Sequence, residues 1–145
     1  MTVPWEVLVV SSDVERRRGL AAILRRESID PICAGTVCEC QSILAKGGVG
    51  LVFCDSQLFD GTYRDLITAS RAMKSRARVV VTSHDGNWDE YLEAMRLGAF
   101  DVIASPCRPT DVEWMVIQAR RDERIRGRQV LGGHSNVANN NLAQA

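Results

Sequence analysis

The segment Leu51-Val-Phe-Cys-Asp55-Ser-Gln-Leu-Phe-Asp-Gly-Thr62 decides the fold of this chain. It begins with four apolar residues and turns polar at Asp55. A short run that is apolar at every position indicates a strand covered on both faces, because a strand with one wet face would alternate. We therefore expect a buried strand over residues 51–54 that ends at a carboxylate.

Four further segments have the character of short strands, and segments with apolar residues at helical spacing lie between and after them. The expected strands cover residues 7–10, 32–34, 77–82 and 101–104. Asp13 has the position of a helix N-cap, and Thr36 and Thr110 each stand three residues before a glutamate, the spacing of a capping box. Strands that alternate with helices favour parallel pairing through right-handed crossovers. The sequence therefore predicts an α/β fold with helices on both faces of one parallel sheet.

The composition limits the functions that the chain can have. A length of 145 residues suits one domain, and 18 Lys and Arg balance 18 Asp and Glu, so no large positive field exists to hold nucleic acid or a membrane surface. No apolar run approaches the roughly 20 residues of a membrane span, no secretory signal is evident, and five cysteines are an odd number. We therefore expect a cytoplasmic domain with reduced thiols over residues 1–126. The Gly- and Asn-rich residues 127–145 are expected to form a flexible tail.

Candidate functional residues stand where the expected strands end. In open α/β sheets, ligands bind beyond the carboxyl ends of the strands. These ends carry polar groups, namely Ser11, Ser12, Asp13, Asp55, Thr82 and Ser105. We expect them to gather at one edge of the sheet.

In order and spacing, these positions resemble the receiver domain of bacterial two-component response regulators, the CheY-like superfamily, over about residues 6 to 125. The most similar part is the segment 51–62, followed by Thr82 and by the Ala94-x-x-x-Gly98-Ala99-x-Asp101 junction. The resemblance implies a flavodoxin-like (βα)5 fold with strand order 2-1-3-4-5. It also implies that Asp55 holds the phosphoacceptor position and that Thr82 is the switch hydroxyl.

In that family a phosphoryl group passes from a phosphohistidine donor to the aspartate. The resemblance implies three supports: an acidic pair that holds Mg²⁺ with the aspartate, a lysine that contacts the phosphoryl oxygens, and an aromatic switch residue. Here the acidic pair is replaced by Ser11 and Ser12, the lysine by Ser105 and the aromatic residue by Val102. Hydroxyl groups are poorer Mg²⁺ ligands than carboxylates. We also expect Asp55 to have few charged neighbours.

These replacements predict a degenerate receiver that is not an enzyme, needs no cofactor and acts through protein contacts. The contact surface is expected on the fourth helix, fifth strand and fifth helix, with Val102, Trp114 and Met115 exposed. The partner is another protein or a second copy, and the chain itself is not expected to contact nucleic acid.

Two alternatives remain open at this stage. In the first, a histidine kinase phosphorylates Asp55, and Asp13 acts as a substitute acid that holds Mg²⁺ weakly with Asp55, instead of only capping its helix. In the second, the chain is a small flavodoxin-like enzyme or cofactor binder, although Ser11-Ser12-Asp13-Val14-Glu15 is not a Gly-rich phosphate loop.

Overall fold

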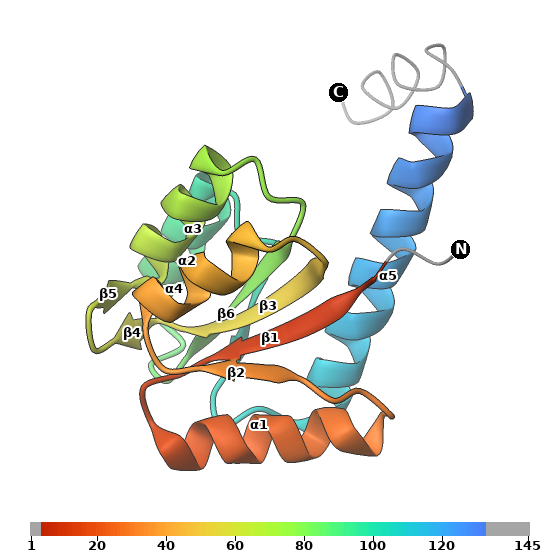
Figure 1. Cartoon of the computed structure of the whole chain (residues 1–145). Coiled ribbons are helices and arrows are strands. Elements are labelled where there is room, and N and C mark those ends of the chain that lie inside the picture. Colours follow the sequence, from red (N-terminus) through yellow and green to blue (C-terminus); the bar gives the residue numbers. More distant parts are fainter. Residues whose placement is uncertain (1–3, 133–145) are drawn as a thin grey trace.

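A computed structural model describes residues 4–132. It has five parallel strands in the order β2-β1-β3-β6-β7, which confirms the predicted α/β fold and strand order, with β6 and β7 as the fourth and fifth strands of the sheet (Figure 1). The elements in chain order are β1 (Glu6–Val10), α1 (Val14–Arg26), β2 (Ile32–Ala34), α2 (Val37–Ala45), β3 (Val49–Asp55), β4 (Gln57–Leu58), β5 (Gly61–Thr62), α3 (Tyr63–Ala72), β6 (Arg78–Ser83), α4 (Trp88–Leu97), β7 (Asp101–Ala104) and α5 (Pro109–Gly132).

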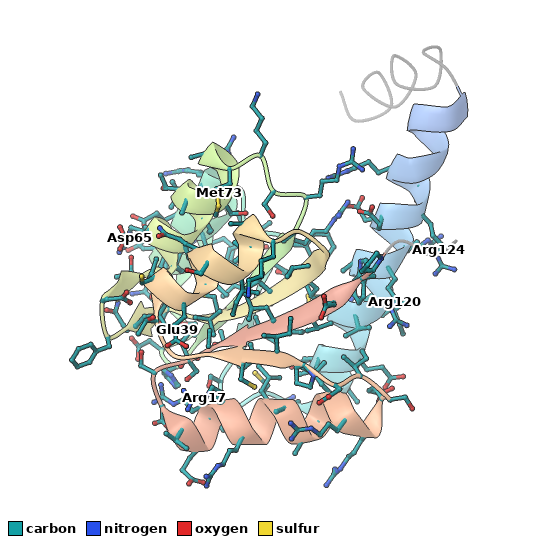
Figure 2. All side chains as sticks on the ribbon, in the orientation of Figure 1. Arg17, Glu39, Asp65, Met73, Arg120 and Arg124 are labelled. Atoms are coloured by element: carbon teal, nitrogen blue, oxygen red, sulfur yellow. The ribbon has the colours of Figure 1, made fainter. Side chains whose placement is uncertain are left out.

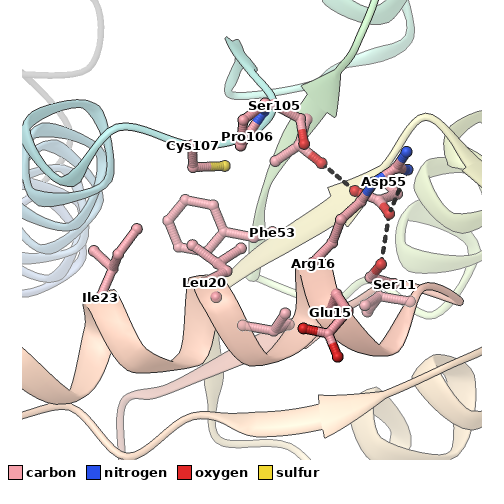
Figure 3. A pocket seen from close by; sticks show the side chains of 14 residues that line it. Ser11, Glu15, Arg16, Leu20, Ile23, Phe53, Asp55, Ser105, Pro106 and Cys107 are labelled. Carbon is pink, nitrogen blue, oxygen red and sulfur yellow. Dashed lines mark hydrogen bonds and ion pairs between the residues drawn. The ribbon is translucent and has the colours of Figure 1, made fainter.

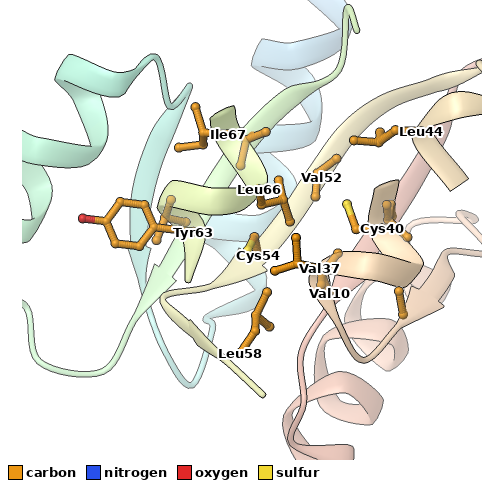
Figure 4. Close-up of a cluster of buried hydrophobic side chains, with 14 of the residues drawn as sticks. Val10, Val37, Cys40, Leu44, Val52, Cys54, Leu58, Tyr63, Leu66 and Ile67 are labelled. Carbon is orange, nitrogen blue, oxygen red and sulfur yellow. The ribbon is translucent and has the colours of Figure 1, made fainter. Parts of the chain in front are cut away.

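Two apolar layers hold the sheet between its helices. Successive side chains of a strand point to opposite faces, so a continuous apolar run supplies both layers. Val52 and Cys54 of β3 pack with α2, α3 and α4 on one face, whereas Leu51 and Phe53 pack with α1 and α5 on the other (Figures 1 and 4). Every residue of β3 is buried. The central position of β3 explains why the segment 51–54 has no polar residue.

The helix starts show which capping signals were read correctly. Asp13 and Thr36 are N-caps, as predicted: the Asp13 side chain accepts from two backbone N–H groups of α1, and the Thr36 side chain accepts from that of Glu39 in α2. The capping box expected at Thr36 is only half formed, because the Glu39 carboxylate accepts from the backbone N–H of Gly35 and not from that of Thr36. The expectation for Thr110 is wrong, because α5 already begins at Pro109. Proline suits the first position of a helix, where no backbone donor is needed. A capping box that the sequence analysis missed joins Thr62 and Asp65 at the start of α3.

The segment after Asp55 forms a small antiparallel hairpin that was not predicted. Gln57 pairs with Thr62 and Leu58 with Gly61, so Phe59 and Asp60 form its turn. This hairpin places Asp60 against the start of α2, where its carboxylate accepts hydrogen bonds from the backbone N–H of Val37 and of the next residue.

Helix α5 covers the sheet with one stripe and leaves the opposite side exposed. Its buried residues are Val112, Met115, Val116 and Ala119. Met115 is therefore not exposed as predicted, because the inward stripe follows the spacing i, i+3, i+4, i+7 from Val112. Trp114 is exposed, as expected.

Polar and aromatic contacts join α5 to the edge of the sheet opposite Asp55. The buried Arg78 on β6 forms ion pairs with Asp122 and Glu123. Arg120 projects from α5 (Figure 2), and its guanidinium lies 4.8 Å from the ring centre of Trp5. The helix continues past residue 126, where the sequence predicted the domain to end, and residues 133–145 of the predicted tail lie outside the described residues. Within the described part of the chain, no helix combines the length and the apolar character that a membrane span requires.

Candidate functional site

The carboxyl ends of the parallel strands bring the predicted site residues together. Asp55 is the last residue of β3 and pairs in register with Thr82 of β6. Ser11 follows β1, and Ser105 follows β7. These four residues line one cavity of about 290 Å³ (Figure 3). The structure thus brings four of the six predicted site residues together at one edge of the sheet; Ser12 and Asp13 do not line this cavity.

Both oxygens of the Asp55 carboxylate accept short hydrogen bonds from hydroxyl groups. The Thr82 hydroxyl donates to Oδ1 at 2.6 Å, and the Ser11 hydroxyl donates to Oδ2 at 2.6 Å. A hydroxyl has one proton, so Ser11 cannot also donate to the carbonyl oxygen of Asp13, 3.2 Å away. Hydrogen bonds to an ionised acceptor are stronger than those between neutral groups. The protein's own donors therefore hold this buried carboxylate in place.

Arg16 supplies a charge that the sequence analysis did not place at the site. Its guanidinium lies 3.7 Å from Asp55 Oδ2 and 3.7 Å from Asp13 Oδ2. Among the described residues Arg16 is the ion-pair partner of Asp55, which agrees with the expectation of few charged neighbours. Arg16 stands in the first turn of α1 and its side chain reaches back over the strand ends (Figure 3). A separation of 3.7 Å is an ion pair and is too long for a hydrogen bond.

The other two residues of the β1–α1 loop have structural partners. The Ser12 hydroxyl donates to the carbonyl oxygen of Gly35 at 2.6 Å and accepts from the backbone N–H of Phe59 at 2.8 Å. Ser12 thus joins the end of β2 to the hairpin and makes no hydrogen bond to Asp55. The side chain of Asp13 accepts from the backbone N–H groups of Arg16 and Glu15, and the first of these bonds is the main reason that the pKa of Asp13 lies below its usual value.

Ser105 and Val102, which stand at the positions of the family's lysine and aromatic residue, line two different hollows. Ser105 lines the cavity beside Asp55, and its backbone N–H donates to the carbonyl oxygen of Ser83 at 2.8 Å. Val102 is half-buried on β7 and lines a separate hollow of about 180 Å³ with Trp88 and Tyr91. Val102 therefore belongs to the α4 side of the sheet edge, away from the Asp55 cavity.

Mg²⁺ prefers several carboxylate and water oxygens in octahedral arrangement. The described residues contain no group of three or more His, Cys, Asp or Glu side chains placed to share a metal ion. The site supplies one buried carboxylate, that of Asp55, and the hydroxyl of Ser11 donates a hydrogen bond to it at a position that the resemblance assigns to a metal-binding acid. The residues present do not fit the Mg²⁺ site of an ordinary receiver.

Comparison with known proteins supports the same fold and family. No family model matches the chain. The chain is 31% identical over 110 residues to the two-component response regulator PprB of Pseudomonas aeruginosa, covering 72% of this chain and 39% of that protein. Across the curated relatives that it matches, the chain spans only 22% to 61% of their length.

Solved receiver domains match most of the chain. The receiver domain of NtrX from Brucella abortus is 26% identical with a TM-score of 0.71, over 79% of this chain and 97% of that domain. The dimer of the beryllofluoride-activated NtrC4 receiver domain is 22% identical with a TM-score of 0.75, over 81% of this chain and 97% of that one. With the sheet order and the buried aspartate at the end of β3, these similarities show that the chain belongs to the response regulator receiver domains of the CheY-like type.

Proposed function

We propose that this receiver domain is degenerate: it signals through contact with another protein and does not depend on Mg²⁺-assisted phosphorylation of Asp55. The observation that carries the proposal is the 2.6 Å hydrogen bond from the Ser11 hydroxyl to Asp55. The resemblance implies that a working receiver has a metal-binding acid at the position of Ser11. A hydroxyl at this position donates a hydrogen bond to Asp55 Oδ2 in place of a metal ion.

The charges near Asp55 also favour this proposal. Phosphoryl transfer is accelerated mainly by positioned cations that neutralise the charge developing on the phosphoryl oxygens. Ser105 provides no cation, and Arg16, the ion-pair partner of Asp55 among the described residues, is shared with Asp13. Each lost support raises the barrier by several kcal/mol, on the order of 3 kcal/mol for one donor.

The proposed contact surface lies at the outer edge of the sheet, where β7 has a neighbouring strand on one side only. Trp88 and Tyr91 stack with their ring centres 5.3 Å apart and, with Val102, line the hollow of about 180 Å³. Trp88 is 68% exposed, and Trp114 is also exposed on α5. Large exposed aromatic residues are typical anchors of protein interfaces.

A second copy of the chain is the partner that we propose to test first, because the NtrC4 relative is described as a receiver domain dimer. Sedimentation velocity of the natural chain should then show a concentration-dependent dimer, which Trp88→Ser weakens at least tenfold. Phe59→Ser is the matched control, since Phe59 is also an exposed aromatic residue and lies in the turn of the hairpin. A chain that stays monomeric at high concentration, or equal effects of the two substitutions, would contradict this interface.

One observation favours the alternative that a histidine kinase of a cytoplasmic two-component system phosphorylates Asp55. Arg16 brings a guanidinium within 3.7 Å of the carboxylate and could contact an incoming phosphoryl group. Calorimetric titration with Mg²⁺ separates the two proposals. The degenerate receiver should give no saturable heat, whereas the double variant Ser11→Asp/Ser12→Asp should bind the ion. Tight, saturable binding by the natural chain would favour the phosphoacceptor.

A further inference from the structure

The cavity beside Asp55 has more apolar lining than a phosphorylation site requires. It lies between α1 and the loop that joins β7 to α5, and its volume is about 290 Å³ (Figure 3). The side chains of its apolar part are Leu20, Ile23, Phe53, Pro106 and Cys107. Burial raises the pKa of the Cys107 thiol to about 12, so this side chain is neutral near pH 7 and behaves as a small apolar group.

Gly19 keeps the α1 side of the cavity open. It lies in the interior of a 13-residue helix, where glycine is about 1 kcal/mol less favourable than alanine. A Cβ atom added at this position would meet no other atom within 4 Å. Packing therefore does not require glycine here, and a larger side chain at the same position would narrow the cavity.

The polar end of the cavity is negatively charged. Asp55 is 5% exposed and accepts two hydroxyl hydrogen bonds, although an ionised carboxylate has about four acceptor positions. Glu15 also lines the cavity, and Arg16 is the cation at its rim. Because Arg16 makes no hydrogen bond to Asp55 at 3.7 Å, a stronger donor could displace it from the carboxylate.

We propose that this cavity binds a small amine with an apolar body, whose ammonium group donates to the free acceptor positions of Asp55. The apolar body packs against Leu20, Ile23 and Phe53. A volume of about 290 Å³ is at the lower end of ligand pockets and suits a molecule of roughly ten non-hydrogen atoms. An anionic ligand would meet the charge of Asp55, and a bare metal ion would leave the apolar walls without a partner.

The test is a set of calorimetric titrations of the full chain with three ligands of similar size. Phenethylamine should bind saturably and at least tenfold more tightly than 2-phenylethanol, which lacks the charge, and phenylacetate should not bind. Equal binding of the amine and the alcohol, tighter binding of phenylacetate, or no saturable binding of phenethylamine would overturn the proposal.

Variants then place the binding at this cavity. Asp55→Asn and Gly19→Leu should each weaken phenethylamine binding at least tenfold, the first by removing the charge and the second by filling the space. Asp30→Asn and Arg26→Leu are the matched controls, because they change exposed residues at the other end of α1 and beyond it, and they should bind as the natural chain does. Circular dichroism checks that every variant is folded. Unchanged binding by the folded Asp55→Asn and Gly19→Leu variants would place the ligand elsewhere and overturn the proposal.

Discussion

The substitution Ser11→Asp tests how closely the protein's own donors hold Asp55. The natural hydroxyl donates at 2.6 Å to Asp55 Oδ2, and a hydrogen bond to an ionised group contributes about 1.5 to 3 kcal/mol. An aspartate at position 11 removes that donor and sets a second carboxylate close to the first. At about 4 Å and an effective dielectric constant near 20, two like charges repel by about 4 kcal/mol, of which Arg16 offsets a part.

We therefore expect Ser11→Asp to lower the free energy of unfolding by about 3 kcal/mol at neutral pH without Mg²⁺. Ser11→Asn is the control of similar shape, because its amide can still donate to Asp55, and it should lose about 1 kcal/mol or less. Urea unfolding with and without Mg²⁺ measures both variants. At an ion concentration of 100 times the dissociation constant, Mg²⁺ should restore about 2.7 kcal/mol to Ser11→Asp alone.

Two results would refute this reasoning. Equal stability of Ser11→Asp and Ser11→Asn without Mg²⁺ would mean that the side chain at position 11 does not lie against Asp55. A natural chain whose unfolding midpoint rises with Mg²⁺ would mean that the site binds the ion despite its serines.

Two further predictions concern the parts of the fold that support the site. Arg78→Met should lower the free energy of unfolding by about 2 to 3 kcal/mol, because it leaves Asp122 and Glu123 without their buried partner. The control is Arg25→Met, which breaks the exposed ion pair with Asp30 and should change the free energy of unfolding by less than about 0.5 kcal/mol. Urea unfolding measures both variants. If the two variants were equally stable, the buried ion pairs would not hold α5 to β6. The backbone N–H groups of α2 lower the pKa of Asp60 in the folded state. The ionised Asp60 therefore adds to the free energy of unfolding above its unfolded pKa of about 3.9, and this stabilisation is lost as the pH falls through the lower pKa of the folded state. Asp60→Asn should therefore lose less stability than the natural chain between about pH 5 and pH 2, and parallel pH profiles of the urea midpoint would contradict this role.

The framework of the fold was readable from the sequence because buried parallel strands leave an uninterrupted apolar signal. The run 51–54 marked β3, and the polar residue after each central strand marked the edge where Asp55 and Thr82 meet. Thr110 and Met115 were misread for a local reason. Pro109 takes the first position of α5, and the inward stripe that begins at Val112 includes Met115 and leaves Trp114 outside.

The partners of Asp55 were less accessible to sequence reasoning. Arg16 looked like one of several exposed arginines on α1, although its place three residues after the N-cap Asp13 was a signal that it could turn back toward the strand ends. The resemblance to receivers identified Ser11 as a lost acid, but only the geometry shows that its hydroxyl donates to Asp55. The cavity next to Ser11 and Asp55 is lined by four elements, β1, α1, β3 and β6, and by the loop between β7 and α5, so it leaves no pattern in the sequence.

Intact-mass spectrometry after incubation with acetyl phosphate and Mg²⁺ is the most direct measure of whether Asp55 still accepts a phosphoryl group. A receiver domain that retains the acidic pair and the lysine serves as the positive control. The structure around Ser11, Arg16 and Ser105 predicts that the natural chain keeps its unmodified mass while the control gains a phosphoryl group. A phosphoryl adduct on the natural chain that disappears in Asp55→Asn would contradict the degenerate receiver.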